Sequence, residues 1–474
     1  MAKEYQCLIG GKWRSTAEKL EVKNPYNGEV VGVVSRANPN DLDEAISGAV
    51  KAFEVTRELP TFKRAEFLGK IVKGLTERSE EIARMISMEA GKPIRDARGE
   101  VGRAISTFTI AMEESKRIGG EVIPLDINAA SAGRVAITRR FPIGPIAGIS
   151  PFNFPLNLMC HKVAPALASG NTIVHKPASA VPITAILLGE IAMEAGVPGG
   201  AFNVVPCSGS VGERLATDDR IKMVTFTGSD PVGWHLKSVC GKKRITLELG
   251  GDAGVIVHSD ADLPYAVNRC VTGAFSYSGQ VCISVQKIFV HEPIFDDFVG
   301  SFIEKTKTLK VGDPLDEATD IGPMIDLDNA RRVESWVDEA VSAGAKVLAG
   351  GVREGSLYHP TVLTNVTPDM KVSCFEVFAP VVSIVPYQDY KDALAKINNT
   401  RFGLQAGIFT RDVKQIFEAF HKVEVGGLIV NDVPTYRVDH MPYGGTKDSG
   451  MGREGLKYAI EEMTEVKIMA LNLA

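Results

Sequence analysis

One cysteine in the sequence stands where a nucleophile could act. Cys282 lies in the segment SYSGQVCISVQKIFV, after the turn-favouring pair Ser278 and Gly279 and before a predicted strand that begins at Lys287. Backbone amides at such a loop-to-strand junction can point at a ligand. The thiolate is the reactive form, and a free thiol with a pKa of about 8.5 needs help to ionise at neutral pH. Taken alone, the apolar surroundings also fit a structural cysteine.

A glutamate inside a predicted strand is the second candidate. In ITLELGG the side chains of Ile245, Leu247 and Leu249 face one way, so Glu248 faces the other way, directly before two glycines. Burying a carboxylate is costly unless it has a partner or a chemical role, so Glu248 is a candidate general base. The alternative is an edge strand with one solvated face.

Asn153 is the third candidate, in the segment PFNFPLN that follows the predicted strand IAGIS. The carboxyl end of a parallel strand is the usual place for ligands in α/β sheets. The side-chain amide of Asn153 can donate a hydrogen bond to an oxyanion that develops during a reaction. Asparagine in such a turn can also simply satisfy backbone groups.

The segments that must position these residues alternate in type. Residues 41–120 show helical spacing of apolar side chains after a cap at Asp41, so we expect helices to open the chain. From about residue 140, short β-rich runs alternate with helical patterns, which predicts a doubly wound parallel sheet. The runs are IAGIS (146–150), NTIVH (171–175), FNVV (202–205), KMVTF (222–226) and ITLEL (245–249).

A second series of β-rich runs predicts a second lobe of the same kind, so we expect an α/β protein with two doubly wound parallel-sheet lobes and a cleft between them. The alternating segment Arg134 to Arg140 predicts a ribbon that leaves its lobe. The chain end at 459–469 is expected to pair with something outside its own lobe. The second series is VIVH (255–258), KIFV (287–290), VVSIV (381–385), AGIF (406–409) and GLIVN (427–431).

Composition excludes several classes of protein. A chain of 474 residues with 45% hydrophobic residues is long enough for two or three domains with real cores. A net charge of −5 gives nucleic acid no long-range attraction. We expect no signal peptide, no membrane segment and no metal site, because the start lacks an apolar core and the cysteines lack ligand spacing. The seven cysteines are odd in number and scattered, as expected for reduced thiols in a cytoplasmic protein.

Seven ordered motifs give the sequence a resemblance to a known family. In order and spacing the chain resembles the NAD(P)-dependent aldehyde dehydrogenase superfamily, from about residue 8 to 470. The resemblance implies a Rossmann-like cofactor domain at residues 1–120 and 141–250, a catalytic domain at 251–445, and a β-ribbon oligomerisation element at 121–140 and 458–474. The motifs are PFNFPLN, HKPAS (175–179), FTGS (226–229), LELGG (247–251), SGQVC (278–282), EVFAPV (376–381) and YGGTKDSGMGREG (443–455).

The resemblance also implies a role for each of the three candidates. Cys282 attacks the aldehyde carbonyl and forms a thiohemiacetal, whose oxyanion is held by the side chain of Asn153 and the backbone N–H of Cys282. Loss of hydride to the nicotinamide leaves a thioester. Glu248 then activates the water that releases the carboxylic acid.

The sequence has no GxGxxG fingerprint, and the resemblance implies a different cofactor site. Ser179 stands where many NAD-specific members have a glutamate, so NADP is tolerated as well as NAD. Lys176 and Ser179 flank the adenosine ribose, Gly209 lies near the adenine, and Glu376 with Phe378 hold the nicotinamide end. The pyrophosphate lies at Ser229 and the start of the next helix, with Val232 and Leu236. Further residues assigned to the cofactor are Ile149, Phe152 and Leu249.

For the aldehyde, the resemblance implies a tunnel with several polar residues. Arg103 and Arg437 fall near positions where members acting on anionic aldehydes place phosphate-binding arginines, whereas the arginine that those members place before the nucleophile is Val281 here. Lactaldehyde, glyceraldehyde and succinic semialdehyde are the expected candidates. The alternative is that Arg103 lies on a helix surface and Arg437 bridges the lobes. The tunnel residues are Phe154, Leu158, His161, Val281, Ile283 and the loop from Pro434 to Met441.

Three other functions compete with this interpretation. A coenzyme-A-acylating dehydrogenase of the same family usually lacks the glutamate base, which is present here as Glu248. A non-catalytic structural relative would not need to keep both Cys282 and Glu248. A cysteine hydrolase needs a partner histidine, and none of the eight histidines lies in a motif that suggests one. The expected partners are a small aldehyde and other copies of the chain, in a homodimer or homotetramer.

Overall fold

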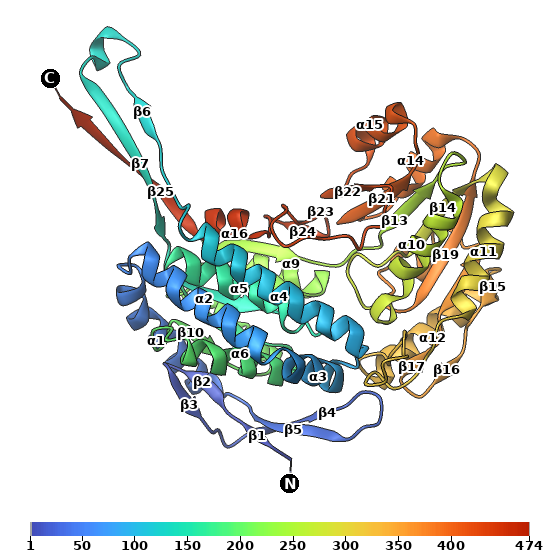
Figure 1. Cartoon of the computed structure of the whole chain (residues 1–474), viewed down its shortest axis with the longest axis horizontal. Helices are drawn as coiled ribbons and strands as arrows, with labels where there is room; N and C mark the ends of the chain where they lie inside the picture. The colour runs from blue at the N-terminus through green and yellow to red at the C-terminus, as the bar shows by residue number, and fades with distance from the viewer. Residues whose placement is uncertain (1, 474) are drawn as a thin grey trace.

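Two large β-sheets lie at the centres of two lobes, and a thin ribbon projects from the first lobe (Figure 1). The computed structural model describes residues 2–473. The first sheet contains, in spatial order, β24 (Gly450–Met451), β12 (Arg244–Glu248), β11 (Met223–Thr227), β8 (Pro145–Ile149), β9 (Thr172–Lys176), β10 (Phe202–Val204), β2 (Cys7–Ile9) and β3 (Lys12–Arg14).

The five central strands of this sheet, from β12 to β10, run parallel and are covered on both faces. Side chains of a strand alternate between faces. Ile146 and Ile173 pack against five helices, while Ala147 and Val174 pack against α1 (Pro39–Thr56) on the opposite face. The predicted doubly wound sheet is confirmed. The five helices are α2 (Thr61–Glu77), α3 (Ser79–Ala90), α4 (Ile94–Glu114), α5 (Asn157–Ser169) and α6 (Ile183–Glu194).

The second sheet repeats this arrangement. Val255 and Ile288 pack against α10 (Leu263–Phe275) and α11 (Phe295–Lys307) on one face. Ile256 and Phe289 pack against α14 (Tyr390–Asn398) and α15 (Val413–Lys422) on the other. Six of its strands are parallel, and β15 is an antiparallel edge. In spatial order they are β15 (Lys346–Ala349), β18 (Thr361–Thr364), β19 (Val381–Tyr387), β14 (Lys287–His291), β13 (Gly254–Val257), β21 (Gln405–Phe409) and β22 (Gly427–Val430).

The ribbon is a three-stranded sheet in which the end of the chain takes part (Figure 1). β7 (Arg134–Pro142) pairs antiparallel with β25 (Thr464–Asn472) from Thr464 opposite Pro142 to Asn472 opposite Arg134. On its other side β7 pairs with β6 (Val122–Pro124). The chain end therefore pairs outside both large sheets, and its partner is the ribbon of the same chain.

The expectation that helices open the chain is wrong. Five short strands precede α1, and two of them, β2 and β3, extend the first sheet through a hairpin. The turn consists of Gly10 and Gly11, whose φ values of 60° and 80° lie in the left-handed region that favours glycine. These strands are too short to show an alternating pattern in the sequence. The other three, β1 (Glu4–Tyr5), β4 (Lys19–Lys23) and β5 (Val30–Ser35), form a separate sheet.

Two further observations concern the described residues, 2–473, as a whole. No helix among them has the length and apolar character needed to cross a membrane, and no group of three or more His, Cys, Asp or Glu side chains could hold a metal ion. All seven cysteines are free thiols, and the most exposed are Cys282 and Cys374.

A buried ion pair fixes the start of α5, and with it the segment that contains Asn153. Lys92 and Glu100 form this pair with almost no exposure of either side chain. Glu100 Oε1 also accepts hydrogen bonds from the backbone N–H groups of Leu156 (2.9 Å) and Asn157 (3.1 Å). The Lys92 ammonium lies 3.7 Å from the ring centroid of Phe154. One lysine thus neutralises the carboxylate that caps α5 and packs on the aromatic residue beside Asn153.

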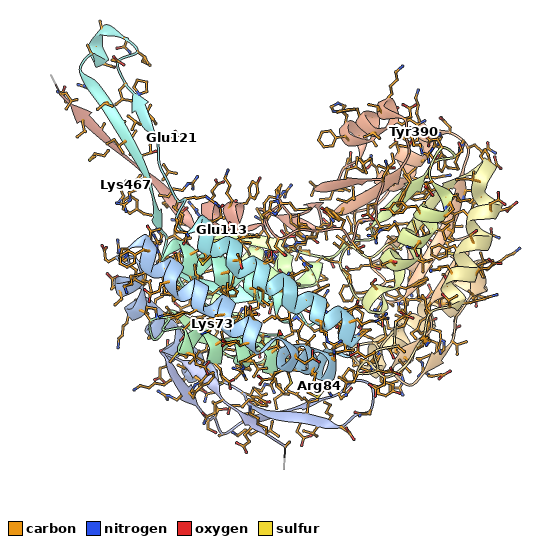
Figure 2. The ribbon with its side chains drawn as sticks, in the orientation of Figure 1. Lys73, Arg84, Glu113, Glu121, Tyr390 and Lys467 are labelled. Carbon is orange, nitrogen blue, oxygen red and sulfur yellow. The ribbon has the colours of Figure 1, made fainter. Side chains whose placement is uncertain are left out.

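The variant Lys92→Met is expected to destabilise the protein by about 3 kcal/mol or more, because it leaves Glu100 as an unpaired buried charge. Urea unfolding measures this effect. The control is Lys73→Met on the exposed face of α2, labelled in Figure 2, where the change should stay within about 0.5 kcal/mol. Equal urea midpoints of unfolding for the two variants would show that the buried ion pair contributes no more to stability than the exposed one.

Candidate active site

A cavity of about 380 Å³ lies where the two lobes face each other, and it contains the three predicted catalytic side chains. Asn153 and Glu248 reach it from the carboxyl ends of strands in the first sheet, and Cys282 reaches it from the loop before β14. The structure thus brings the three residues singled out from the sequence together in one cavity.

The loop that presents Cys282 has an unusual backbone. Tyr277, Ser278 and Gly279 have φ values of 49°, 54° and 65°, three consecutive residues in the left-handed region. Side-chain bonds hold this conformation: the Ser278 hydroxyl donates to the Gly322 carbonyl (2.7 Å), and the Tyr277 hydroxyl donates to the Ala90 carbonyl (3.1 Å). Such strain persists only where surrounding contacts over-determine it. The turn predicted before the nucleophile is therefore present and rigidly supported.

Asn153 faces the nucleophile loop directly. Its Nδ2 donates a hydrogen bond of 2.9 Å to the carbonyl of Gln280, two residues before Cys282. The Gln280 side chain is itself tied to the Pro323 carbonyl and the Ile325 N–H. An amide group has two N–H bonds, so one remains available to a ligand while the other fixes the orientation of Asn153.

Glu248 is a buried carboxylate, 3% exposed, at the last position of β12. Both of its carboxylate oxygens are buried without a hydrogen-bond partner among the described residues. Burial raises the pKa of Glu248 well above its ordinary range, and the nearby carboxylate of Glu454 adds to this. The alternative of an edge strand with a solvated face is excluded. A carboxyl group kept in this state binds a proton more readily than an exposed one.

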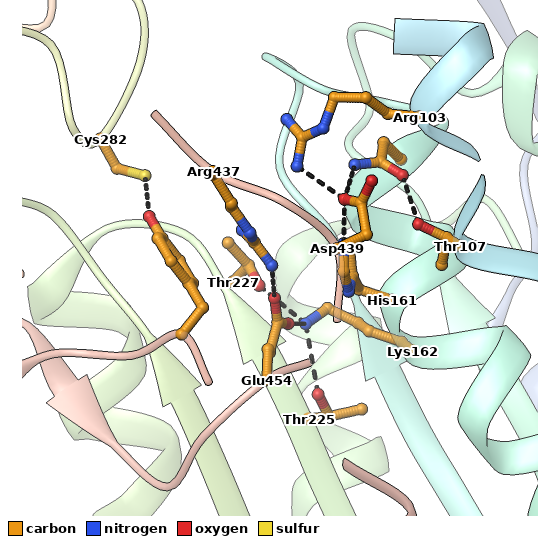
Figure 3. Close-up of polar contacts among 12 residues, drawn as sticks. Arg103, Thr107, His161, Lys162, Thr225, Thr227, Cys282, Arg437, Asp439 and Glu454 are labelled. Carbon is orange, nitrogen blue, oxygen red and sulfur yellow. Dashed lines mark hydrogen bonds and ion pairs between the residues drawn. The ribbon is translucent and has the colours of Figure 1, made fainter. Parts of the chain in front are cut away.

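Figure 3 shows a network of buried charges, formed by Glu454, Lys162 and Arg437. All three act electrostatically on Glu248. Glu454 Oε1 accepts a hydrogen bond of 3.0 Å from Lys162 on α5, and Glu454 Oε2 accepts one of 3.1 Å from Arg437. Lys162 also donates to the hydroxyls of Thr225 and Thr227 on β11. Burial would raise the pKa of Glu454, but the two cations lower it to about 2. Sequence reasoning missed Lys162, although a lysine within the apolar α5 is an unusual residue.

Arg437 continues this network toward the nucleophile. Its guanidinium lies 3.6 Å from the ring centroid of Tyr443, and the Tyr443 hydroxyl lies 3.2 Å from Cys282 Sγ (Figure 3). Burial raises the pKa of the Cys282 thiol to about 12, while the Tyr443 hydrogen bond and Arg437 act in the opposite direction. Tyr443 was not singled out from the sequence, where it was visible only as the first residue of a matching motif.

Asp439 organises a second polar cluster, which contains Arg103 (Figure 3). Its Oδ1 receives hydrogen bonds from Arg103 (2.8 Å), His161 (2.9 Å) and Asn157 (3.2 Å). Burial would raise the pKa of Asp439, but His161 and Arg103 hold it well below its usual range. Arg103 is therefore a partly exposed residue held by a carboxylate. Arg437 is buried and connects the loop after β22 to Glu454, which agrees with the alternative that Arg437 is a bridging residue.

The apolar residues predicted to line the tunnel pack around Cys282. Ile283 is buried against Leu404 and Tyr443, and Val281 and Cys282 border the same cluster. The ring of Phe154 packs edge-on to Tyr277, with the Arg103 guanidinium 5.9 Å from its centroid. Leu158 lines the cavity. The predicted flanks of Cys282 are thus apolar, and the charged groups that act on its thiol are Glu376, Arg437 and Glu248.

Five of the predicted cofactor residues line the same cavity as Cys282: Phe152, Ser229, Leu249, Glu376 and Phe378. Phe152 and Phe378 contact each other edge to face, with ring centroids 5.8 Å apart. Glu376 Oε1 accepts a hydrogen bond of 3.1 Å from the backbone N–H of Gly251, and burial raises its pKa to about 8. Ser229 is the N-cap of α9 (Asp230–Val239) and makes no side-chain cap bond.

The remaining predicted cofactor residues lie outside this cavity. Ile149 and Lys176 are the last residues of the neighbouring strands β8 and β9, and the exposed Ser179 follows shortly after. Gly209 is the first residue of α7 (Gly209–Gly212). Val232, on α9, is 48% exposed. The assignment of Leu236 to the pyrophosphate is wrong. Leu236 is 4% exposed and is enclosed in the hydrophobic core with Leu247 and Leu249, so its side chain is not available to a pyrophosphate.

Asp252, which directly follows the motif LELGG, pairs with a buried lysine. Asp252 Oδ2 accepts hydrogen bonds from Lys287 Nζ (2.6 Å) and the Thr400 hydroxyl (2.7 Å). Lys287 also donates to the Ser373 carbonyl (3.2 Å), in the segment that leads to Glu376. Asp252 is thus a structural partner of a buried lysine.

Comparison with known proteins decides the family. The model of the aldehyde dehydrogenase family matches residues 13–469 of the chain. The chain belongs to the aldehyde dehydrogenase family. As a member it is an NAD(P)-dependent oxidoreductase, and the predicted family, fold class and general function are confirmed.

Three similar aldehyde dehydrogenases place the chain within the family. The 3-sulfolactaldehyde dehydrogenase of Priestia megaterium is 48% identical over 472 residues, covering 99% of this chain and 98% of that protein. Aldehyde dehydrogenase 21 of Physcomitrella patens, solved with the reaction product succinate, is 45% identical with a TM-score of 0.98, covering 100% and 99%. The glyceraldehyde-3-phosphate dehydrogenase GapN of Methanocaldococcus jannaschii, solved with NADP, is 42% identical with a TM-score of 0.92, covering 96% and 99%.

The variant Gly279→Ala is expected to lower activity by at least about a hundredfold while the protein stays folded. An added Cβ would lie 2.1 Å from the Ala379 carbonyl oxygen, and a small displacement of reacting groups has a large kinetic cost. Steady-state kinetics and circular dichroism measure the two properties. Gly300→Ala on α11, where a Cβ meets nothing within 4 Å, is the control that should leave both unchanged. Near-normal activity of Gly279→Ala would contradict the importance of this turn.

Proposed function

We propose that this aldehyde dehydrogenase oxidises a small aldehyde with an anionic tail to its carboxylic acid, with Cys282 as nucleophile, Asn153 as oxyanion donor and Glu248 as general base. The observation that supports this most directly is the common cavity of the three side chains. A thiol, a neutral donor and a buried carboxyl group are the three groups that oxidation through a thioester requires.

The residues present fit a nicotinamide dinucleotide. Ser229 leaves its hydroxyl unused at the N-terminus of α9, where the helix dipole and free N–H groups favour a phosphate. Phe152 and Phe378 form an aromatic wall beside Cys282 for the nicotinamide end, and Glu376 lies next to them in the same cavity. We assign Lys176, Ser179 and Gly209 to the adenosine end. When bound, the nicotinamide supplies the oxidant, because it accepts a hydride from the substrate carbon.

In the first half-reaction the thiolate of Cys282 adds to the aldehyde carbon. The carbonyl oxygen becomes an oxyanion, and the free N–H of the Asn153 amide with the backbone N–H of Cys282 stabilises that charge. The sulfur-bound carbon then loses its hydride, which leaves a thioester on Cys282. The apolar contacts of Ile283 and Val281 keep this end of the site poor in water.

In the second half-reaction Glu248 removes a proton from water, which attacks the thioester and expels the thiolate. The raised pKa makes the Glu248 carboxylate a stronger base than an exposed one. The carboxylate form is needed, so hydrolysis should slow as the pH falls through the raised pKa. Lys162 and Arg437 hold Glu454 ionised, and Glu248 therefore remains the carboxyl group of the pair that binds the proton.

The anionic tail is inferred from Arg103 and from the relatives. Arg103 is partly exposed beside Phe154, and Asp439 fixes one of its guanidinium nitrogens. The names of the three relatives refer to 3-sulfolactaldehyde, succinate and glyceraldehyde-3-phosphate, each a compound with an anionic group. Arg437 adds positive charge behind Tyr443. We therefore place the tail of the substrate toward Arg103.

Three observations count against the three competing functions. A coenzyme-A-acylating enzyme has no use for a buried base, and Glu248 is present. A cysteine hydrolase needs a histidine on its nucleophile, whereas the hydrogen-bond partner of Cys282 Sγ is Tyr443 and His161 is bonded to Asp439. A structural relative without catalysis would not need the strained loop that presents Cys282.

We also propose how the chain is divided and assembled. Residues 1–120 and 141–250 form the cofactor domain, and residues 251–445 form the catalytic domain. Residues 121–140 and 458–474 form the oligomerisation element of a homodimer or homotetramer, because Val466, Ile468 and Met469 on β25 are each more than half exposed at a free sheet edge. The free cysteines support a cytoplasmic location.

The variant Glu248→Gln is expected to give one burst of reduced cofactor per active site and then little turnover, because hydride loss precedes the step that needs the base. Cys282→Ala should give neither burst nor turnover while it still binds cofactor. Stopped-flow absorbance at 340 nm measures both. Steady turnover by Cys282→Ala within tenfold of wild type would contradict the assignment of the nucleophile.

The variant Arg103→Gln should raise the KM for succinic semialdehyde by about tenfold to a hundredfold, the loss of one charge-assisted contact, and leave the KM for lactaldehyde unchanged. Arg84→Gln, an exposed arginine on α3 labelled in Figure 2, is the control. Equal effects on the charged and neutral substrates would show that Arg103 has a structural role only.

The variant Ser179→Glu is expected to weaken NADP binding far more than NAD binding, because a carboxylate near the ribose repels the 2′-phosphate. Ser179→Ala controls for loss of the hydroxyl without added charge. Titration calorimetry with both cofactors measures the difference. Equal effects on NAD and NADP would place Ser179 away from the ribose.

A further inference from the structure

Tyr443 is the described residue in closest polar contact with the sulfur of the nucleophile. Its hydroxyl oxygen lies 3.2 Å from Cys282 Sγ (Figure 3). The tyrosine is 3% exposed and packs with Ile283 and Leu404, so water has little access to this contact. A hydrogen bond to a charged atom in such surroundings is stronger than one in water.

Three independent contacts fix the position of this tyrosine. Its backbone N–H donates to the Glu454 carbonyl (3.1 Å), and its carbonyl accepts from the Glu454 N–H (2.7 Å). The Arg437 guanidinium lies on the ring face at 3.6 Å. The backbone bonds to Glu454 and the Arg437 guanidinium on the ring face therefore hold the Tyr443 hydroxyl in position beside Cys282. The hydroxyl does not need to move when the sulfur ionises.

We propose that Tyr443 is a further catalytic residue, whose hydroxyl donates a hydrogen bond to the Cys282 thiolate before it attacks the aldehyde and again when it leaves the thioester. The inference rests on the proposed role of Cys282 as nucleophile. The contact is with the reacting atom itself, so the residue acts directly and not through a neighbour.

The direction of the hydrogen bond follows from the environment of the phenol. Burial raises the pKa of Tyr443 well above its ordinary value, so the hydroxyl keeps its proton when the thiol loses its own. The same bond lowers the pKa of Cys282, against the opposing effect of burial. Arg437 on the ring face adds a positive charge that favours the thiolate.

A stabilised thiolate is a weaker nucleophile, but the net effect on reactivity is favourable. Tenfold more thiolate lowers the intrinsic reactivity of each thiolate only about threefold, since the Brønsted coefficient for thiolates is about 0.4–0.5. While the thiol is mostly protonated at working pH, the gain in population exceeds this loss. The hydroxyl therefore raises the reactivity of Cys282 at neutral pH and makes it a better leaving group.

The hydroxyl and the ring of Tyr443 have separable roles, which two variants distinguish. Tyr443→Phe removes the hydroxyl and keeps the ring on which Arg437 lies. Tyr443→Leu removes both. The control is Tyr390→Phe, which deletes a hydroxyl bonded to the Gln415 carbonyl far from the site, at the position labelled in Figure 2.

The decisive measurement is the pH dependence of Cys282 alkylation by iodoacetamide, followed by mass spectrometry of the peptide that contains Cys282. Tyr443→Phe should slow alkylation of Cys282 about threefold or more at every pH from 7 to 9, because less of the thiol is ionised. Tyr390→Phe should match wild type, and alkylation of the partly exposed Cys374 should be the same in every sample. An unchanged Cys282 profile in Tyr443→Phe would overturn the proposal.

Kinetics provide the second arm. Tyr443→Phe should lower kcat about threefold to tenfold with an unchanged KM for succinic semialdehyde, whereas Tyr443→Leu should also raise that KM, because Arg437 loses its support. A raised KM in Tyr443→Phe with unchanged alkylation would make Tyr443 a binding residue and contradict the proposal. Alkylation needs neither cofactor nor aldehyde, so it reports on Tyr443 even if turnover by Cys282→Ala refutes the proposed function.

Discussion

The catalytic centre depends on one buried carboxylate, Glu454, which two buried cations hold ionised. Lys162 from α5 and Arg437 from the loop after β22 each bond one of its oxygens. Without the two cations, the free-energy cost of burying the charged Glu454 would be too high. Without Glu454, the same would hold for the charges of Lys162 and Arg437. The same negative charge faces Glu248 and helps to raise its pKa while that of Glu454 is lowered. The pKa values of two glutamates in one site are thus shifted in opposite directions: Glu454 stays ionised and has a structural role, whereas Glu248 can bind and release a proton.

This ionic centre also joins segments that are distant in the sequence. Lys162 bonds the threonines at the end of β11, next to the strand that ends in Glu248, and Arg437 reaches Cys282 through Tyr443. One network therefore acts electrostatically on Glu248 and reaches Cys282 through Tyr443. The second polar cluster around Asp439 holds Arg103 beside Phe154, at the end of the site where we place the anionic tail. Charge in the interior sets both the acid–base chemistry and the expected substrate class.

Much of the fold was predictable because its signals are local. The β-rich runs of both lobes became strands within one or two residues, since a continuous apolar run closed by Gly or Pro marks a buried parallel strand. The hairpin of β2 and β3 was not predicted, because strands of only three residues are too short to show an alternating pattern of apolar and polar residues. Cys282, Glu248 and Asn153 were found from residue type and context. Tyr443 and Glu454 could not be found in this way, because each depends on a contact with a residue far away in the sequence. Tyr443 contacts Cys282, more than 160 residues away, and Glu454 contacts Lys162, more than 290 residues away. Leu236 was misassigned because its burial depends on contacts with Leu247 and Leu249, which the helical pattern of the sequence does not reveal.

The central claim is that the substrate becomes covalently attached to Cys282. The most direct test is rapid acid quenching during oxidation of succinic semialdehyde with NADP, at a pH low enough to slow hydrolysis by Glu248, followed by mass spectrometry of all cysteine peptides. The account predicts an acyl group of the substrate's mass on the peptide that contains Cys282 and on none of the other six cysteines. Turnover with no acyl group at any time, or with the acyl group on another cysteine, would contradict it.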